Sequence, residues 1–133
     1  MKYLLDTDIC AYIISGRRED TATHFARVRP GDIAISTISL AELAFGAFKS
    51  GSARNQERLQ VFISPLTVVS FDSDAAMVYG DLRNKLQRAG TPIGPMDMQI
   101  AAHALTLDLT LVTSNVRDFK RVPALRVDSW AAA

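Results

Sequence analysis

Short apolar stretches alternate with segments of helical periodicity, and this alternation constrains the fold more than any other feature of the chain. Helical crossovers between consecutive strands force those strands to pair in parallel, with helices on both faces of the sheet. The expected fold is therefore an α/β/α sandwich around a central, mainly parallel sheet of four or five strands. The predicted strands are residues 2–6, 32–36, 66–71, 109–114 and a small edge strand within 125–130.

The segments between these strands carry recognisable helix boundaries. The longest helix is expected to begin at a cap formed by Ser73 or Asp74 and to run to Gly90. Two prolines and two glycines in residues 90–95 form a loop before the next helix. Residues 115–123 are expected to form a turn. Further helices are predicted after the first strand and over residues 18–28, 38–50, 53–63 and 98–107.

Four acidic residues follow or precede these strands at comparable places. Asp6 ends the first strand, Glu42 lies early in the helix after the second, Asp97 opens the helix before the fourth, and Asp118 follows the fourth closely. In open parallel sheets the functional crevice lies beyond the carboxyl ends of the strands. The sequence therefore predicts that the four acids converge there.

Each acid also has an ordinary structural explanation. Asp6 or Asp8 can simply cap a helix, and Asp97 is a typical first-turn anion. Asp118 lies among basic residues and can form an exposed ion pair. Glu42 shares helical spacing with residues that would form a solvated stripe, namely Ser39, Gly46 and Lys49.

The combination of acids favours a metal site over independent caps. Clustered carboxylates raise one another's pKa and cost stability unless a cation neutralises them. Ligands that are all oxygen favour Mg²⁺, with Mn²⁺ as a possible substitute, over zinc. A metal held in this way supports in-line hydrolysis of a phosphodiester without an imidazole base. His24 and His103 are accordingly expected to have packing or surface roles.

Composition limits the remaining options. A chain of 133 residues fits a single domain, 1–133, with its own core. Cys10 is its only cysteine, which excludes an internal disulfide and favours a reducing cytoplasm. The apolar runs are too short to span a membrane, and no membrane partner is expected. The formal net charge of +1 means that any basic surface must be local.

Four blocks of sequence resemble the PIN-domain ribonucleases, and specifically the VapC toxins of bacterial VapBC toxin-antitoxin pairs. The likeness spans almost the whole chain, and the blocks stand in the family's order at suitable separations. They are "YLLDTDICAYII", "AISTISLAELAFGAF", "PIGPMDMQIAAHAL" and "LTLVTSNVRDFKRVPALRVDSW".

This resemblance implies a magnesium-dependent endoribonuclease with a PIN-like fold. It implies that Asp6 and Asp97 are the principal metal ligands and that Glu42 completes the acidic core, directly or through water. Asp118 would be the fourth acid. Ser39, one helical turn before Glu42, matches a small hydroxyl residue of the family and would orient ligands or phosphate.

The chain departs from the family pattern near the fourth acid. Many PIN domains carry an acid directly after the strand, where this chain has Asn115. Asp8 and Asn115 are expected to support the site without binding the metal directly. Met96 stands where a polar residue is familiar, and Ala124 where the corresponding turn has glycine. The changes at Met96 and Ala124 remove no ligand, whereas Asn115 leaves the role of the fourth acid to Asp118, three residues later.

The blocks "GP.D..IAAHAL" and "LVT.N...F.RV" resemble the group that cleaves initiator transfer RNA in its anticodon loop. Single-stranded loops suit such a nuclease because their backbone is accessible. The basic residues that would hold flanking phosphates, unless they are scattered solubility charges, are Lys49, Arg54, Arg117, Lys120 and Arg121.

The resemblance also implies protein partners. These are a cognate VapB-type antitoxin, a second toxin subunit in a homodimer, and a larger toxin-antitoxin complex that binds operator DNA only through the antitoxin. Phe45 and Phe48 lie outside the expected core stripe of their helix. They provide a landing site for the antitoxin or, alternatively, are buried against a neighbouring helix.

Two rival functions remain. The strand-ending "LLDTD" also fits a haloacid-dehalogenase-type phosphatase, but Glu42 and the block around Asp97 have no place in that family. A catalytically silent PIN fold that only binds protein is the second rival. A metal titration separates the cases, because only the nuclease would cut RNA in a metal-dependent way.

Overall fold

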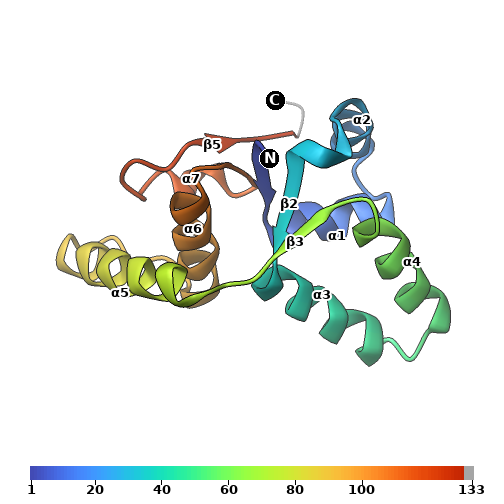
Figure 1. Ribbon diagram of the computed structural model, residues 1–133, viewed down its shortest axis with the longest axis horizontal. Helices are drawn as coiled ribbons and strands as arrows, with labels where there is room; N and C mark the ends of the chain where they lie inside the picture. The colour runs from blue at the N-terminus through green and yellow to red at the C-terminus, as the bar shows by residue number, and fades with distance from the viewer. Residues whose placement is uncertain (131–133) are drawn as a thin grey trace.

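The computed structural model describes residues 1–130, which form a five-stranded sheet between helices (Figure 1). Every strand pairs in parallel with its neighbours, and the order is β3-β2-β1-β4-β5. The predicted α/β/α sandwich is therefore confirmed, with β1 in the middle and β5 at an edge. The strands are β1 (Tyr3–Leu5), β2 (Ile33–Ser36), β3 (Thr67–Val69), β4 (Thr110–Val112) and β5 (Val127–Asp128).

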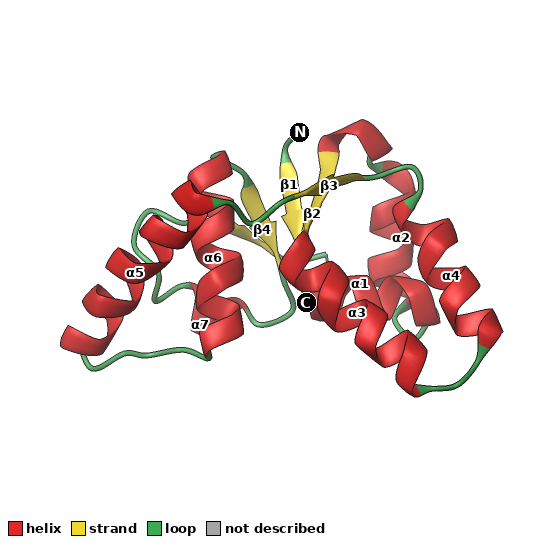
Figure 2. Cartoon of the chain, turned by 60° about the horizontal axis from the view of Figure 1, so that its bottom comes forward, coloured by secondary structure: helices red, strands yellow, loops and turns green. Residues whose placement is uncertain are grey.

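Helices connect the strands and cover both faces of the sheet (Figures 1 and 2). The group α1 to α4 lies on one side of the molecule, while α5 and α6 pack against each other on the other side. The helices are α1 (Thr7–Ser15), α2 (Glu19–Arg27), α3 (Thr37–Lys49), α4 (Ala53–Ile63), α5 (Ser73–Arg88), α6 (Pro95–Leu107) and the short α7 (Val116–Phe119). A 3₁₀ turn, Pro30–Asp32, precedes β2.

The alternation of side chains along β1 divides the apolar core between the two faces. Leu4 packs in the cluster formed with α5, α6 and Phe119, whereas Leu5 packs with α1, α4 and Trp130 on the opposite face. Both leucines are completely buried. A strand covered on both faces is apolar throughout, which explains why the short run before Asp6 contains no alternating polar residue.

Three local features differ from the sequence-based expectations. Asp72 caps α5, because its Oδ1 accepts the backbone N–H of Ala75 at 3.0 Å, so the predicted cap at Ser73 or Asp74 is wrong. The stretch expected as a turn contains the helix α7. Neither Phe45 nor Phe48 is buried against a neighbouring helix of this chain: they are 67% and 68% exposed.

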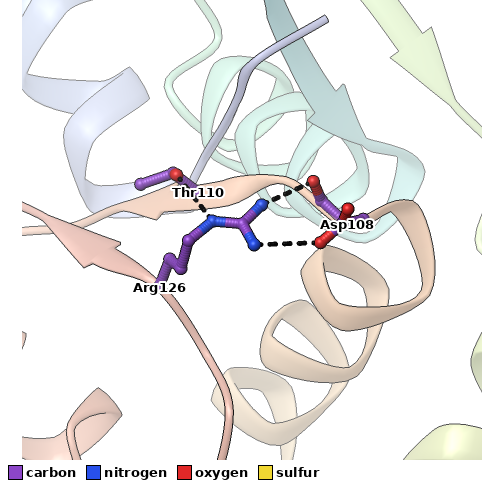
Figure 3. Close-up of polar contacts among 3 residues, drawn as sticks. All are labelled: Asp108, Thr110 and Arg126. Atoms are coloured by element: carbon purple, nitrogen blue, oxygen red, sulfur yellow. Dashed lines mark hydrogen bonds and ion pairs between the residues drawn. The ribbon is translucent and has the colours of Figure 1, made fainter.

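The connection from α6 to the edge strand is held by Arg126 (Figure 3). Its guanidinium donates to Asp108 Oδ1 at 3.0 Å, to the Asp108 carbonyl at 2.7 Å and to Thr110 Oγ1 at 3.4 Å. Both members of the ion pair are largely exposed, so it contributes at most about 1 kcal/mol. This contact keeps β5 aligned beside β4. The strand on the other side of β4 is β1, which is followed by Asp6.

Within residues 1–130, no helix combines the length and the apolar character that crossing a lipid bilayer requires. Cys10 is buried in the core against β1 and Trp130, as its place in an apolar stretch predicts.

Candidate active site

Asp6 lies at the carboxyl end of the central strand and is 5% exposed. Its Oδ1 accepts the backbone N–H of Ile9 at 2.9 Å and caps α1, while its Oδ2 accepts a hydrogen bond from the Thr113 hydroxyl. Burial raises the pKa of Asp6 to about 6, and the bonds from Thr113 and Ile9 offset only part of that rise. Asp6 therefore does cap α1, as the simpler explanation expects. Its carboxyl group is also buried, however, and a helix cap alone does not require a buried acid.

Asp97 lies in the first turn of α6 and is half-buried. Its pKa is raised first by burial and then by the negative charges of Asp8, Asp118 and Glu42. Asp97 also adds to the raised pKa of Asp6. Acids on α1, α3 and α7 therefore all raise the pKa of Asp97 on α6, which agrees with the convergence predicted from the strand ends.

Glu42 faces this cluster from α3. Its Oε1 lies 2.8 Å from the hydroxyl of Thr7, which also lies 3.0 Å from the hydroxyl of Ser39. Ser39 is completely buried, so the idea of a solvated stripe through Ser39 and Glu42 is wrong for Ser39. The structure thus joins the start of α1 to the first turns of α3 by side-chain hydroxyls.

Asp118 lies on α7 and is bound from two sides. Asn115 donates its side-chain N–H to Asp118 Oδ2 at 3.0 Å, and Arg121 lies 3.7 Å from Asp118 Oδ1. The ion-pair explanation is therefore correct for Arg121. The charge of Asp118 nevertheless raises the pKa of Asp97, so Asp118 belongs to the edge of the cluster. Asp8 is exposed and raises the pKa of both Asp6 and Asp97.

Two further hydroxyl residues form hydrogen bonds in this region: Thr7 was expected to start the helix after the first strand and to support the site, whereas Thr113 escaped the sequence-based prediction. Thr113, directly after β4, donates to Asp6 and accepts the backbone N–H of Asn115 at 2.9 Å. Thr7 contacts Glu42 and Ser39. Their position next to predicted site residues, in "LLDTD" and "LVTSN", was the available signal. Threonine at a strand end is common for other reasons, and only the pairing of β1 with β4 brings Thr113 to Asp6.

The histidines lie away from the acids, in packing roles. His103 is buried in α6 with its ring edge-on to Phe71 at 5.4 Å, and burial lowers its pKa. His24 stacks on Trp130 with ring centres 4.7 Å apart.

The chemistry of the acids fits a hard divalent cation. All candidate metal ligands bind through oxygen atoms. Burial raises the pKa of two of the carboxyl groups, those of Asp6 and Asp97, which means that their charged forms are destabilised. A cation bound nearby would offset that destabilisation. Among the described residues no three His, Cys, Asp or Glu side chains form a ready-made metal-binding group. Mg²⁺ is typically bound through one or two carboxylates and retains several waters, so a pair of carboxylates is a suitable donor set.

Comparison with known proteins agrees with this geometry. The model of the PIN domain family matches residues 3–125. The chain is 40% identical over 131 residues to the tRNA(fMet)-specific endonuclease VapC of Salmonella typhimurium, and 39% identical over 132 residues to ribonuclease VapC2 of Rickettsia felis, with 98% of every chain covered.

Solved structures show the same likeness. VapBC2 from Rickettsia felis bound to a promoter DNA fragment matches with a TM-score of 0.90 at 39% identity, covering 98% of this chain and 99% of that one. DNA-bound VapBC from Salmonella typhimurium matches equally well, again with a TM-score of 0.90, 39% identity and the same coverage. With the fold, the family model and these relatives in agreement, the chain belongs to the PIN-domain family, among the VapC ribonucleases of toxin-antitoxin systems.

Proposed function

We propose that Asp6, at the carboxyl end of β1, and Asp97, in the first turn of α6, bind Mg²⁺, or Mn²⁺ in its place, and that this site hydrolyses RNA phosphodiester bonds. Convergence of the acids is the observation that carries the proposal: Asp97 is affected by charges on Asp8, Glu42 and Asp118, and it in turn acts on Asp6. Carboxylates held close together repel one another and lower the stability of the fold, and a protein that only binds a partner would have no need of them. The silent binding module is therefore the weaker alternative.

Each acid has a distinct role in this proposal. Asp6 and Asp97 would hold the cation, and Glu42 would complete the acidic core, directly or through water. Asp118 would act at the edge of the site, where Asn115 orients it. Ser39 and Asp8 would support the ligands without binding the metal. When bound, a divalent cation supplies an activated water and stabilises the leaving 3′ oxygen.

The hydrogen bonds from Thr113 and Ile9 are the means by which the protein holds the Asp6 carboxylate. Both carboxylate oxygens accept hydrogen bonds, one from Thr113 directly after β4 and one from Ile9 in α1. Their donated bonds stabilise the charged form of Asp6, which is the form that binds a cation. The carboxylate is therefore fixed in orientation before metal or RNA arrives.

As substrate we propose initiator transfer RNA, cleaved in its anticodon loop. The support is the 40% identity to a relative named tRNA(fMet)-specific endonuclease. Arg117 and Lys120 are exposed on and next to α7, beside Asp118, and are placed to contact flanking phosphates. Arg121 is already engaged with Asp118 and with the carbonyl of Pro92 at 3.4 Å.

We further propose a VapB-type antitoxin as partner, with a toxin homodimer, a larger complex and operator DNA bound through the antitoxin, all in the cytoplasm. Relatives crystallised as VapBC complexes with DNA support this assembly. The exposed rings of Phe45 and Phe48 supply apolar surface suited to a protein contact.

The test compares wild type with Asp97→Asn, both freed of antitoxin, on total cellular RNA with magnesium or with chelator. Newly formed ends are sequenced, and initiator and elongator methionine transfer RNAs are compared as purified substrates. Asp81→Asn is the matched control, because Asp81 is an exposed acid on α5 paired with Lys85 outside the cluster.

Wild type and Asp81→Asn should cut in magnesium only, and Asp97→Asn should lose about 100-fold or more in rate. Cutting in chelator, or equal cutting by Asp97→Asn, would refute the metal site. Ends outside the initiator anticodon loop would refute the substrate while leaving the nuclease intact. Binding of antitoxin without any cutting of RNA would favour the silent module.

A further inference from the structure

The hydroxyl of Thr7 connects two parts of the candidate site that are distant in sequence. Thr7 is the first residue of α1, directly after Asp6, and it lies 35 positions from Glu42 and 32 from Ser39. Its Oγ1 is 2.8 Å from Glu42 Oε1 and 3.0 Å from Ser39 Oγ. Both distances are typical of O–H···O hydrogen bonds.

The number of protons fixes the direction of these bonds. A threonine hydroxyl has one proton to donate, and a carboxylate can only accept. The Thr7 proton therefore goes to Glu42, and the Ser39 hydroxyl donates to a lone pair of Thr7. Ser39 is completely buried, so water does not compete for its proton. The order of donation runs from Ser39 through Thr7 to Glu42.

This order gives Glu42 a fixed orientation that its own helix does not provide. A glutamate side chain has several rotatable bonds and loses considerable rotamer entropy when it is held in place. Thr7 follows Asp6, whose backbone continues β1 and whose side chain is bound to Ile9 and Thr113. The hydroxyl of Thr7 thus ties Glu42 to the same rigid corner of the molecule that places Asp6.

We propose that Thr7 is a positioning residue of the active site, whose hydroxyl, supported by Ser39, holds the Glu42 carboxylate toward Asp97 in advance of cation and RNA. This inference rests on the function proposed above. Thr7 acts through Glu42 and does not itself contact the cation. Loss of a hydrogen bond that orients a metal ligand, from a residue that does not itself bind the metal, typically reduces metal affinity or activity by 10- to 100-fold.

Three variants test the hydroxyl separately from the shape of the side chain. Thr7→Val keeps the branched shape and removes the hydroxyl, whereas Thr7→Ser keeps the hydroxyl and removes the methyl. Thr106→Val is the matched control, since Thr106 is also a part-buried helical threonine, but its hydroxyl bonds only to the Ala102 carbonyl of its own helix at 2.7 Å. Thermal unfolding first verifies that all three are folded.

Magnesium affinity of the antitoxin-free proteins is measured by calorimetry, and kcat and KM are measured on RNA. Thr7→Val should lose about 10- to 100-fold in magnesium affinity and in kcat, and Thr7→Ser should stay within about threefold of wild type. In a Glu42→Ala background, Thr7→Val should have no further effect, because its action runs through Glu42. An additional loss in that background, or equal damage in Thr7→Ser, would overturn the proposal.

A metal-free measurement keeps this inference distinct from the proposed function. NMR order parameters of the Glu42 side chain should fall in Thr7→Val and stay unchanged in Thr106→Val. Unchanged order in Thr7→Val would overturn the positioning role, whatever the metal data show. Failure of wild type to bind magnesium or cut RNA would instead refute the proposed function and the catalytic consequence of Thr7, while the order parameters would still report whether Thr7 holds Glu42.

Discussion

At the scale of single residues, Asp6 combines two demands that oppose each other energetically. As a helix cap it satisfies the N–H of Ile9, which stabilises α1. As a buried carboxylate it must carry its charge away from water and close to Asp97. A protein under selection for stability alone would place a serine or asparagine there, since either caps a helix without a charge.

The raised pKa of Asp6 predicts an unusual pH dependence of stability. Its ordinary value of 3.8 rises to about 6 in the folded state, so the folded protein binds this proton more tightly than the unfolded chain does. Stability should therefore fall as pH rises from about 4 to about 7, and the ionised group should cost roughly 3 kcal/mol at neutral pH. Urea unfolding of metal-free protein across this range measures the effect.

Asp6→Asn is the comparison, because an amide does not titrate. The difference in unfolding free energy between wild type and Asp6→Asn should shift in favour of the variant as pH rises through about 6. Saturating magnesium at pH 7 should restore stability to wild type only. Parallel pH curves for the two proteins would show that Asp6 does not titrate in this range.

Ala124 is a second residue that is expected to lower the stability of the folded protein, because of its backbone conformation. The expected glycine of this turn is missing, and Ala124 adopts the left-handed conformation with φ of 65°. An L-residue pays about 1–2 kcal/mol there, of which the greater backbone entropy of unfolded glycine offsets roughly half. Ala124→Gly should therefore stabilise the protein by up to about 1 kcal/mol in urea unfolding.

Ala89 offers the control for this change. It is an exposed alanine at the end of α5, but its φ of −77° is right-handed. Ala89→Gly should give no gain and a small loss. Stabilisation by both substitutions would mean that the left-handed backbone is not the cause.

At the scale of elements, the start of α5 illustrates how a tertiary contact selects among equivalent local signals. Asp72, Ser73 and Asp74 are all good capping residues, and sequence alone favoured the later two. The backbone N–H of Phe71 bonds to Thr37 Oγ1 at 3.1 Å, which ties the chain to the start of α3 just before the helix. The first residue free to turn is then Asp72, which becomes the cap.

Capping by Asp72 predicts a clear contrast between neighbours. Asp72→Ala should lower the free energy of unfolding by about 1 kcal/mol, because it leaves the N–H of Ala75 without its partner. Ser73→Ala should change it by less than about 0.5 kcal/mol, since Ser73 lies inside the first turn and is exposed. Chemical denaturation measures both, and a larger loss for Ser73→Ala would return the cap to the position that the sequence favoured.

Other elements were predictable to different degrees. The long helix α5 has a periodicity that identifies it, whereas β1 was predicted as a short apolar run that ends at Asp6. The four-residue helix α7 cannot be identified in this way, because so short a helix depends on its surroundings more than on its own sequence. Its presence matters, since it carries Asp118 back toward the strand ends.

At the scale of the whole molecule, the acidic cluster was predictable because it follows from topology. Parallel strands place their carboxyl ends on one side of the sheet, so Asp6, Glu42 and Asp97 are expected on that side, and the order with β1 between β2 and β4 makes their elements neighbours. The hydroxyls of Thr7 and Thr113 were not predictable in the same way. The role of Thr113 depends on β4 pairing with β1, and that of Thr7 on β2 pairing with β1 so that α3 begins beside α1; both pairings are set by packing across the sheet.

The position of β1 between β2 and β4 also determines when this toxin can become harmful during its own synthesis. Asp6 leaves the ribosome well before Thr113, which holds it and follows 107 positions later. An unfinished chain therefore carries Asp6, a proposed metal ligand, without Thr113, which holds its carboxylate. Because β4 pairs with β1, the proposed site can be assembled only after the chain has been synthesised past Thr113.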